Sequence, residues 1–154
     1  MAVTLGALCN SIAAQFEAGM TSLSRVYEYD EIPEGVNAGD TPLLMVYCES
    51  VLADPTGDTD RGTFQTGTNS IKIKEMLFHC DFYTSQRAHL AEDVADAIDT
   101  MSEAIDVIEA QNEYPYWNNS GIKATAGWRM DRVQFDFAGA IYPGFRAEIT
   151  VWVY

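Results

Sequence analysis

The chain has 154 residues, 47% of them hydrophobic and 21% charged, which is the size and composition of one globular domain, 1–154. Nine Lys and Arg residues face 23 Asp and Glu residues, so the formal net charge at pH 7 is −14. Nucleic acids and anionic membranes are held mainly by positive charge, so this balance disfavours both and favours a protein partner or a surface that repels polyanions.

The first third of the chain predicts one helix and two strands. Apolar residues recur every three or four positions over 5–20, which indicates an amphipathic helix capped by Thr4 and ending near Gly19. A short strand rich in β-formers follows at 24–29. After a loop rich in acids, Pro and Gly, the continuous apolar run 43–48 predicts a strand buried on both faces.

The middle of the chain combines a long polar segment with a long strand. Asp, Thr, Gly and Asn dominate 53–70, which predicts a surface loop. The following strand is expected over 71–83, with a bulge near Glu75 where the apolar alternation changes phase. Its core-facing residues are predicted to be Met76, Phe78, Cys80 and Phe82.

A second helix is expected from Leu90, with Thr84 or Ser85 as its cap. Its apolar positions form one stripe that is expected to face the core: Leu90, Val94, Ile98, Met101, Ile105 and Ile108. Its other face carries acids and no Lys or Arg: Glu92, Asp93, Asp96, Asp99, Glu103, Asp106 and Glu109.

The last third of the chain predicts a polar loop at 112–127 and two strands joined by a hairpin turn at 139–144. The residues expected to face inward are Val133, Phe135, Phe137, Phe145, Ala147, Ile149, Val151 and Val153. The order α-β-β-β-α-β-β predicts an α+β fold with long loops. Its sheet is expected to be mostly antiparallel, with about five strands and two helices on one face.

Few residues are candidates for catalysis or metal binding. His79, Asp81 and His89 are a conceivable metal or acid–base set, and an enzyme would need a pocket near His79, Asp81 and Tyr83. Nothing fixes His89 near the other two, so a half-exposed strand histidine beside a carboxylate is the preferred interpretation.

Other candidate sites are weaker still. The loop acids Asp54, Asp58 and Asp60 lack the spacing of a calcium loop and are interpreted as solvated. Cys9, Cys48 and Cys80 form no CxxC pair and predict buried free thiols in a reducing compartment. The sequence shows no signal peptide and no membrane span, so we expect synthesis in a cytoplasm. We also expect the protein to have no catalytic residues and to bind no cofactor or metal.

The charges are segregated along the chain, with acids on the expected helices and most bases in or beside the expected strands. Two unlike faces on one subunit favour a head-to-tail contact, which closes into a ring if the rotation allows. The candidate subunit-interface residues are Lys72, Lys74, Arg129, Arg132, Arg146, Asp96, Asp99, Glu103, Tyr116 and Trp117.

The order of elements resembles the tail terminator proteins of long-tailed bacteriophages. The resemblance rests on a short N-terminal helix before the Tyr-containing strand at 26–29 and a Pro-containing loop before the apolar strand at 41–47. It also rests on a long strand running into an amphipathic helix and on a final strand after the aromatic-Gly turn at 142–151.

This resemblance implies a structural virion protein of the tail or neck, without catalytic residues. Such subunits form a hexameric ring that caps the tail tube protein and meets the head–tail connector or stopper, while DNA passes through the lumen without sequence-specific binding. The alternatives are another neck component (a tail completion or connector protein), an unrelated acidic adaptor, and a small enzyme or ligand-binding protein.

Overall fold

The computed structural model describes residues 4–36, 38–53, 63–66, 69–72, 74–84, 90–137 and 139–153. Its elements, in chain order, are α1 (Leu5–Gly19), β1 (Arg25–Tyr27), the 3-10 turn η1 (Ala38–Asp40), β2 (Leu43–Ala53), β3 (Thr63–Thr66), β4 (Asn69–Lys72), β5 (Lys74–Tyr83), α2 (Leu90–Glu109), the 3-10 turn η2 (Tyr116–Asn118), β6 (Ile122–Phe137) and β7 (Ala140–Val153). Within these ranges no helix has the length and hydropathy of a membrane span.

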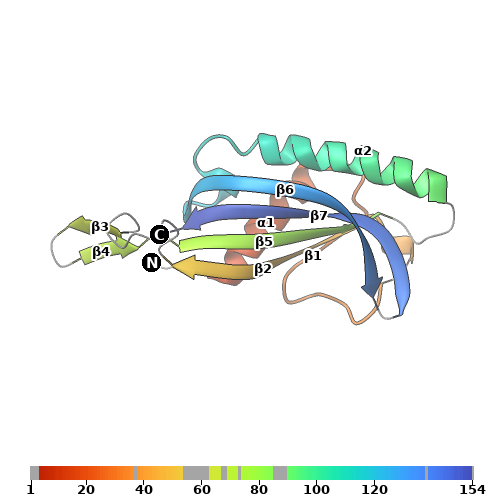
Figure 1. Ribbon diagram of the computed structural model, residues 1–154, viewed down its shortest axis with the longest axis horizontal. Coiled ribbons are helices and arrows are strands. Elements are labelled where there is room, and N and C mark those ends of the chain that lie inside the picture. Colours follow the sequence, from red (N-terminus) through yellow and green to blue (C-terminus); the bar gives the residue numbers. More distant parts are fainter. Residues whose placement is uncertain are drawn as a thin grey trace.

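The main sheet has five strands in the order β1-β2-β5-β7-β6, and β3 and β4 form a separate two-stranded ribbon (Figure 1). The predicted α+β fold with two helices on one sheet is confirmed. The sheet is mixed, whereas we predicted a mostly antiparallel one. The difference arises at β1, which pairs in parallel with β2 because the connection at 28–42 carries the chain back before β2 begins.

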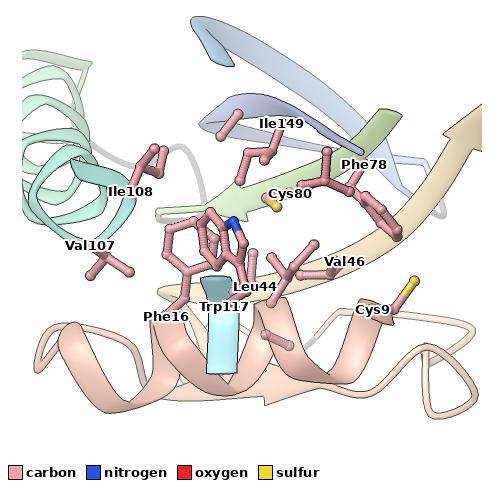
Figure 2. Packing of buried hydrophobic residues seen from close by; sticks show 14 of the residues in the cluster. Cys9, Phe16, Leu44, Val46, Phe78, Cys80, Val107, Ile108, Trp117 and Ile149 are labelled. Atoms are coloured by element: carbon pink, nitrogen blue, oxygen red, sulfur yellow. The ribbon is translucent and has the colours of Figure 1, made fainter. Parts of the chain in front are cut away.

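Helix α1 begins and ends where the sequence places it. The side chain of Thr4 accepts a hydrogen bond from the backbone nitrogen of Ala7 at 3.2 Å, and the helix ends at Gly19. Phe16 points from α1 toward the sheet and lies 5.5 Å, ring to ring, from Trp117 (Figure 2). Both side chains are fully buried, so α1 and η2 close the core together.

Strands β5 and β7 supply the centre of this core, and their predicted phases are confirmed. Each predicted core-facing residue of the two strands is buried: Met76, Phe78, Cys80, Phe82, Phe145, Ala147, Ile149, Val151 and Val153. The three cysteines are free thiols, with Cys9 and Cys80 buried and Cys48 half-buried. Burial raises the pKa of Cys9 to about 11, which keeps this thiol neutral at pH 7.

The predicted core face of α2 is confirmed in part. Ile108 is buried and Met101 packs half-buried against the core, but Ile98, at the middle of the predicted stripe, is 49% exposed. The other buried residues of the described part of α2 are Ala97, Thr100, Ala104 and Val107, so the core face is rotated toward smaller side chains. Small side chains let the helix approach the sheet closely, and the hydroxyl of Thr100 is satisfied by donating to the carbonyl of Asp96 at 2.8 Å.

The boundaries around α2 also differ from the prediction. Thr84 does not cap the helix, because its hydroxyl donates to the carbonyl of Pro143 at 3.0 Å and α2 begins only at Leu90. Ser85, the alternative cap, lies outside the described residues. The segment predicted as a loop at 112–127 contains η2 and the start of β6.

Two other connections are more regular than predicted. The segment 53–70 contains β3 and the first half of β4, which pair antiparallel. The strand predicted over 71–83 is divided, since β4 ends at Lys72 and β5 starts at Lys74. The predicted turn 139–144 is shorter, because β7 already begins at Ala140 after Gly139, whose φ of 81° suits a tight turn.

A second apolar cluster lies on the sheet face opposite the helices. Its buried members are Tyr27, Leu43, Met45, Tyr83, Phe135 and Tyr142. Phe135 was predicted to face inward with Val133 and Phe137, and all three belong to this cluster rather than to the core beneath the helices. Tyr83 and Phe135 stack at 4.3 Å, so the end of the β6–β7 hairpin covers part of the helix-free face.

Candidate functional site

A cluster of polar side chains lies beside this second cluster on the helix-free face. The strand register sets Tyr47 opposite His79, His79 opposite Glu148, and Asp81 opposite Arg146. His79 is 7% and Asp81 5% exposed, so the prediction of a half-exposed histidine is wrong. The cause is the position of β5 as the central strand, where long side chains of β2 and β7 cover it from both sides.

Arg146 and Tyr47 hold the carboxylate of Asp81 from two sides. The guanidinium of Arg146 donates from Nε to Oδ1 at 2.7 Å and from Nη2 to Oδ2 at 3.1 Å. The hydroxyl of Tyr47 donates to Oδ2 at 3.0 Å. The hydrogen bond to Asp81 raises the pKa of Arg146, which keeps it charged. Three donated hydrogen bonds fix this carboxylate as a structural ion pair.

His79 sits at the polar end of the cluster. Its Nε2 lies 3.5 Å from a carboxylate oxygen of Glu148, and its Nδ1 lies 3.8 Å from one of Glu49 and 3.4 Å from the hydroxyl of Tyr47. His89, the other histidine of the hypothetical acid–base set, lies outside the described residues. Tyr47 was not predicted from the sequence as a member of this site. Its side chain lies on the same sheet face as those of His79 and Asp81.

Metal binding has no geometric support in the part of the chain that the structure describes. No group of three or more His, Cys, Asp or Glu side chains there is placed to hold a metal ion. The loop acids Asp54, Asp58 and Asp60 lie outside the described residues.

The buried tyrosines predict how stability depends on alkaline pH. Burial, followed by the charge of Asp81, raises the pKa of Tyr83 to about 12 and that of Tyr47 above its usual value of 10. A raised pKa means that the folded state favours the neutral phenol, so this stabilisation is complete below pH 10 and is lost as the pH rises toward the higher value. We expect the urea midpoint of unfolding to fall between pH 10 and 12.

Tyr83→Phe is expected to reduce this fall, because it removes one ionising group and retains the ring that stacks on Phe135. Tyr114→Phe is the matched control, since Tyr114 is 57% exposed, and its slope should equal that of the wild type. Equal slopes for all three proteins would contradict the prediction. Urea titrations followed by circular dichroism at several pH values provide the measurement.

The predicted interface residues differ in their exposure. Asp96, Asp99, Arg129, Arg132 and Lys74 are exposed, and Glu103 and Tyr116 are half-buried. Arg146 is engaged with Asp81, and only the backbone of Lys72, at the end of β4, is described. Trp117 does not belong in this interface, because it is fully buried against Phe16, and its indole nitrogen donates to Thr125 at 3.2 Å.

The bases are confined to one kind of element, although the strands that hold them also carry six acids: Glu49, Glu75, Asp81, Asp131, Asp136 and Glu148. All Lys and Arg residues within the described ranges lie in strands: Arg25, Lys72, Lys74, Lys123, Arg129, Arg132 and Arg146. Helices α1 and α2 contain acids and no Lys or Arg. The charged side chains of the two helices are therefore all acidic, while the strands carry both signs.

The comparisons with known proteins leave these surfaces as the main guide to function. No protein-family model matches the chain, and no curated protein matches it in sequence.

Proposed function

We propose that the chain is a structural virion protein: the ring subunit of a phage tail terminator, which caps the tail tube and joins it to the head connector. The observation that carries the proposal is the unequal distribution of charge: the helices carry only acids, and all described bases lie in strands, which carry both signs. It is joined by the resemblance of the predicted order of elements to that of tail terminator proteins.

Charge separation favours a head-to-tail contact between copies. Such a contact uses two different surfaces of each subunit and closes into a ring when the rotation between copies allows it. Complementary charges also fix the orientation of the partner. The expectation of six subunits per ring comes only from the resemblance to tail terminator proteins.

The acidic excess suits passage of DNA. A basic lumen would bind phosphates and hold the genome, whereas a chain of net charge −14 repels it. The proposed place of the protein is therefore the neck of the virion, after synthesis in the host cytoplasm, with the tail tube protein and the connector or stopper as partners.

The test combines the purified chain with tail tubes assembled in cells that lack its gene. We expect rings in electron micrographs, one ring at one end of each tube, and tubes that no longer lengthen. A chain that binds the connector but leaves tube ends open would identify the other neck component instead. A chain that forms no ring and binds neither partner would refute the proposal and leave the unrelated adaptor.

A further inference from the structure

Two thiols lie together where α1 packs on β2. Cys9 is on the side of α1 that faces the sheet and is 4% exposed (Figure 2). On β2, the residues Leu44, Val46 and Cys48 alternate onto the sheet face that α1 covers. Cys48 is half-buried and packs against the same core cluster that contains Cys9. Helix and strand therefore hold the two thiols in one layer of the core.

The electrostatic surroundings of Cys9 show how close Cys48 is. Burial raises the pKa of Cys9 to about 11, and the thiol of Cys48 adds to the rise. The backbone N–H of Cys48 opposes the rise by hydrogen bonding to the Cys9 sulfur. The amide nitrogen and the Cβ of a residue are bonded to the same Cα, so a sulfur held against this amide is within reach of the Cys48 side chain. A disulfide requires this kind of approach.

The three cysteines differ in how easily a reagent in solution reaches them. Cys80 is fully buried and Cys9 nearly so, whereas Cys48 is half-buried. Burial raises the pKa of Cys48 as well, so at pH 7 both thiols of the pair are mostly neutral. Because the thiolate is the nucleophile, the pair reacts slowly and stays reduced in a reducing compartment.

We propose that Cys9 and Cys48 form a disulfide that joins α1 to β2 when the folded chain meets a low-molecular-weight disulfide such as glutathione disulfide. The inference does not depend on the proposed function, because it concerns two thiols within one chain. The link closes a loop of about 40 residues, which reduces the freedom of the unfolded chain and stabilises the folded one.

The reaction has two exchange steps. The thiolate of Cys48 attacks one sulfur of glutathione disulfide, forms a mixed disulfide with glutathione and releases the first glutathione thiolate. The thiolate of Cys9 then attacks the Cys48 sulfur, forms the Cys9–Cys48 bond and releases the second glutathione. The two protein thiols lose two protons and two electrons, and the electrons reduce glutathione disulfide to two molecules of glutathione.

Peptide mapping of the full-length chain tests the link. The protein is incubated with glutathione disulfide at pH 8.5, alkylated, and digested without reduction. We expect a peptide that joins Cys9 to Cys48, and a fall from three free thiols to one when thiols are counted in denaturant. The oxidised chain is expected to unfold about 5 °C above the reduced chain, and dithiothreitol should reverse the shift.

Alanine variants separate the three thiols. Cys80→Ala is the matched control and should form the same link, whereas Cys9→Ala should stop at the mixed disulfide of Cys48 with glutathione. The map of the wild type needs no variant. Wild-type Cys48 that keeps its glutathione, joins a second chain or does not react would overturn the proposal, and so would a bond from Cys9 to Cys80. A linked chain that unfolds below the reduced one would show that the bond does not fit the fold.

Discussion

Arg146→Met is expected to lower the free energy of unfolding by about 3 kcal/mol at pH 7. The substitution leaves the carboxylate of Asp81 without its counterion, and the side chain of Asp81 is only 7% exposed. The side chain of Arg146 is itself 30% exposed, which places the loss at the lower end of the range for a buried pair. Among the described residues, the hydroxyl of Tyr47 remains as the one side-chain donor to the carboxylate.

A double-mutant cycle in urea measures the loss. Asp81→Asn with Arg146→Met should be more stable than the sum of the two single changes predicts, because it removes the buried charge together with its partner. Arg129→Met is the control: its ion pair with Asp131 is exposed on both sides, and the urea midpoint should hardly move. If Arg146→Met were as mild as this control, Asp81 would not depend on Arg146.

Gly144→Ala is the second change with a large expected effect, about 3 kcal/mol of lost stability. A Cβ at position 144 would overlap the backbone carbonyl oxygen of Phe82, and it would also press on the ring of Phe135. The register sets Gly144 opposite Tyr83, in the strand beside the central one, so the backbone has little room to move. The close approach of β5 and β7 at this point therefore requires glycine.

The same substitution at Gly127 provides the control. Gly127 lies in β6 on the edge of the same sheet, and a Cβ there would meet no atom within 4 Å. Gly127→Ala should leave the thermal unfolding midpoint close to that of the wild type. A small loss for Gly144→Ala, comparable to that of Gly127→Ala, would show that the two strands separate easily and would contradict the packing described for this region.

Local pattern was sufficient for the elements whose two faces differ strongly. The N-cap at Thr4 and the end at Gly19 follow from cap chemistry, and the core phases of β5 and β7 follow from an apolar residue at every second position. The confinement of the bases to strands could also be predicted from the sequence, because it depends only on which residues form helices and which form strands.

The helix α2 shows where local pattern failed. Its largest apolar residues predicted the core face, but Ile98 is exposed while Ala97 and Ala104 are buried. Periodicity identifies an amphipathic helix but does not fix its rotation when small residues border the apolar stripe. The rotation was decided by how closely the helix can approach the sheet, and it determines that Asp96 and Asp99 line a pocket.

The sequence by itself determined the α+β class, the two helices and the confinement of the described bases to strands. Only the tertiary structure decided which charges are available to a partner. Strand register brings Asp81 to Arg146, and it leaves Arg132 exposed. Register between strands distant in the chain depends on packing of the whole sheet, and no local pattern carries it. The same register buries the cluster around Asp81 between β2, β5 and β7.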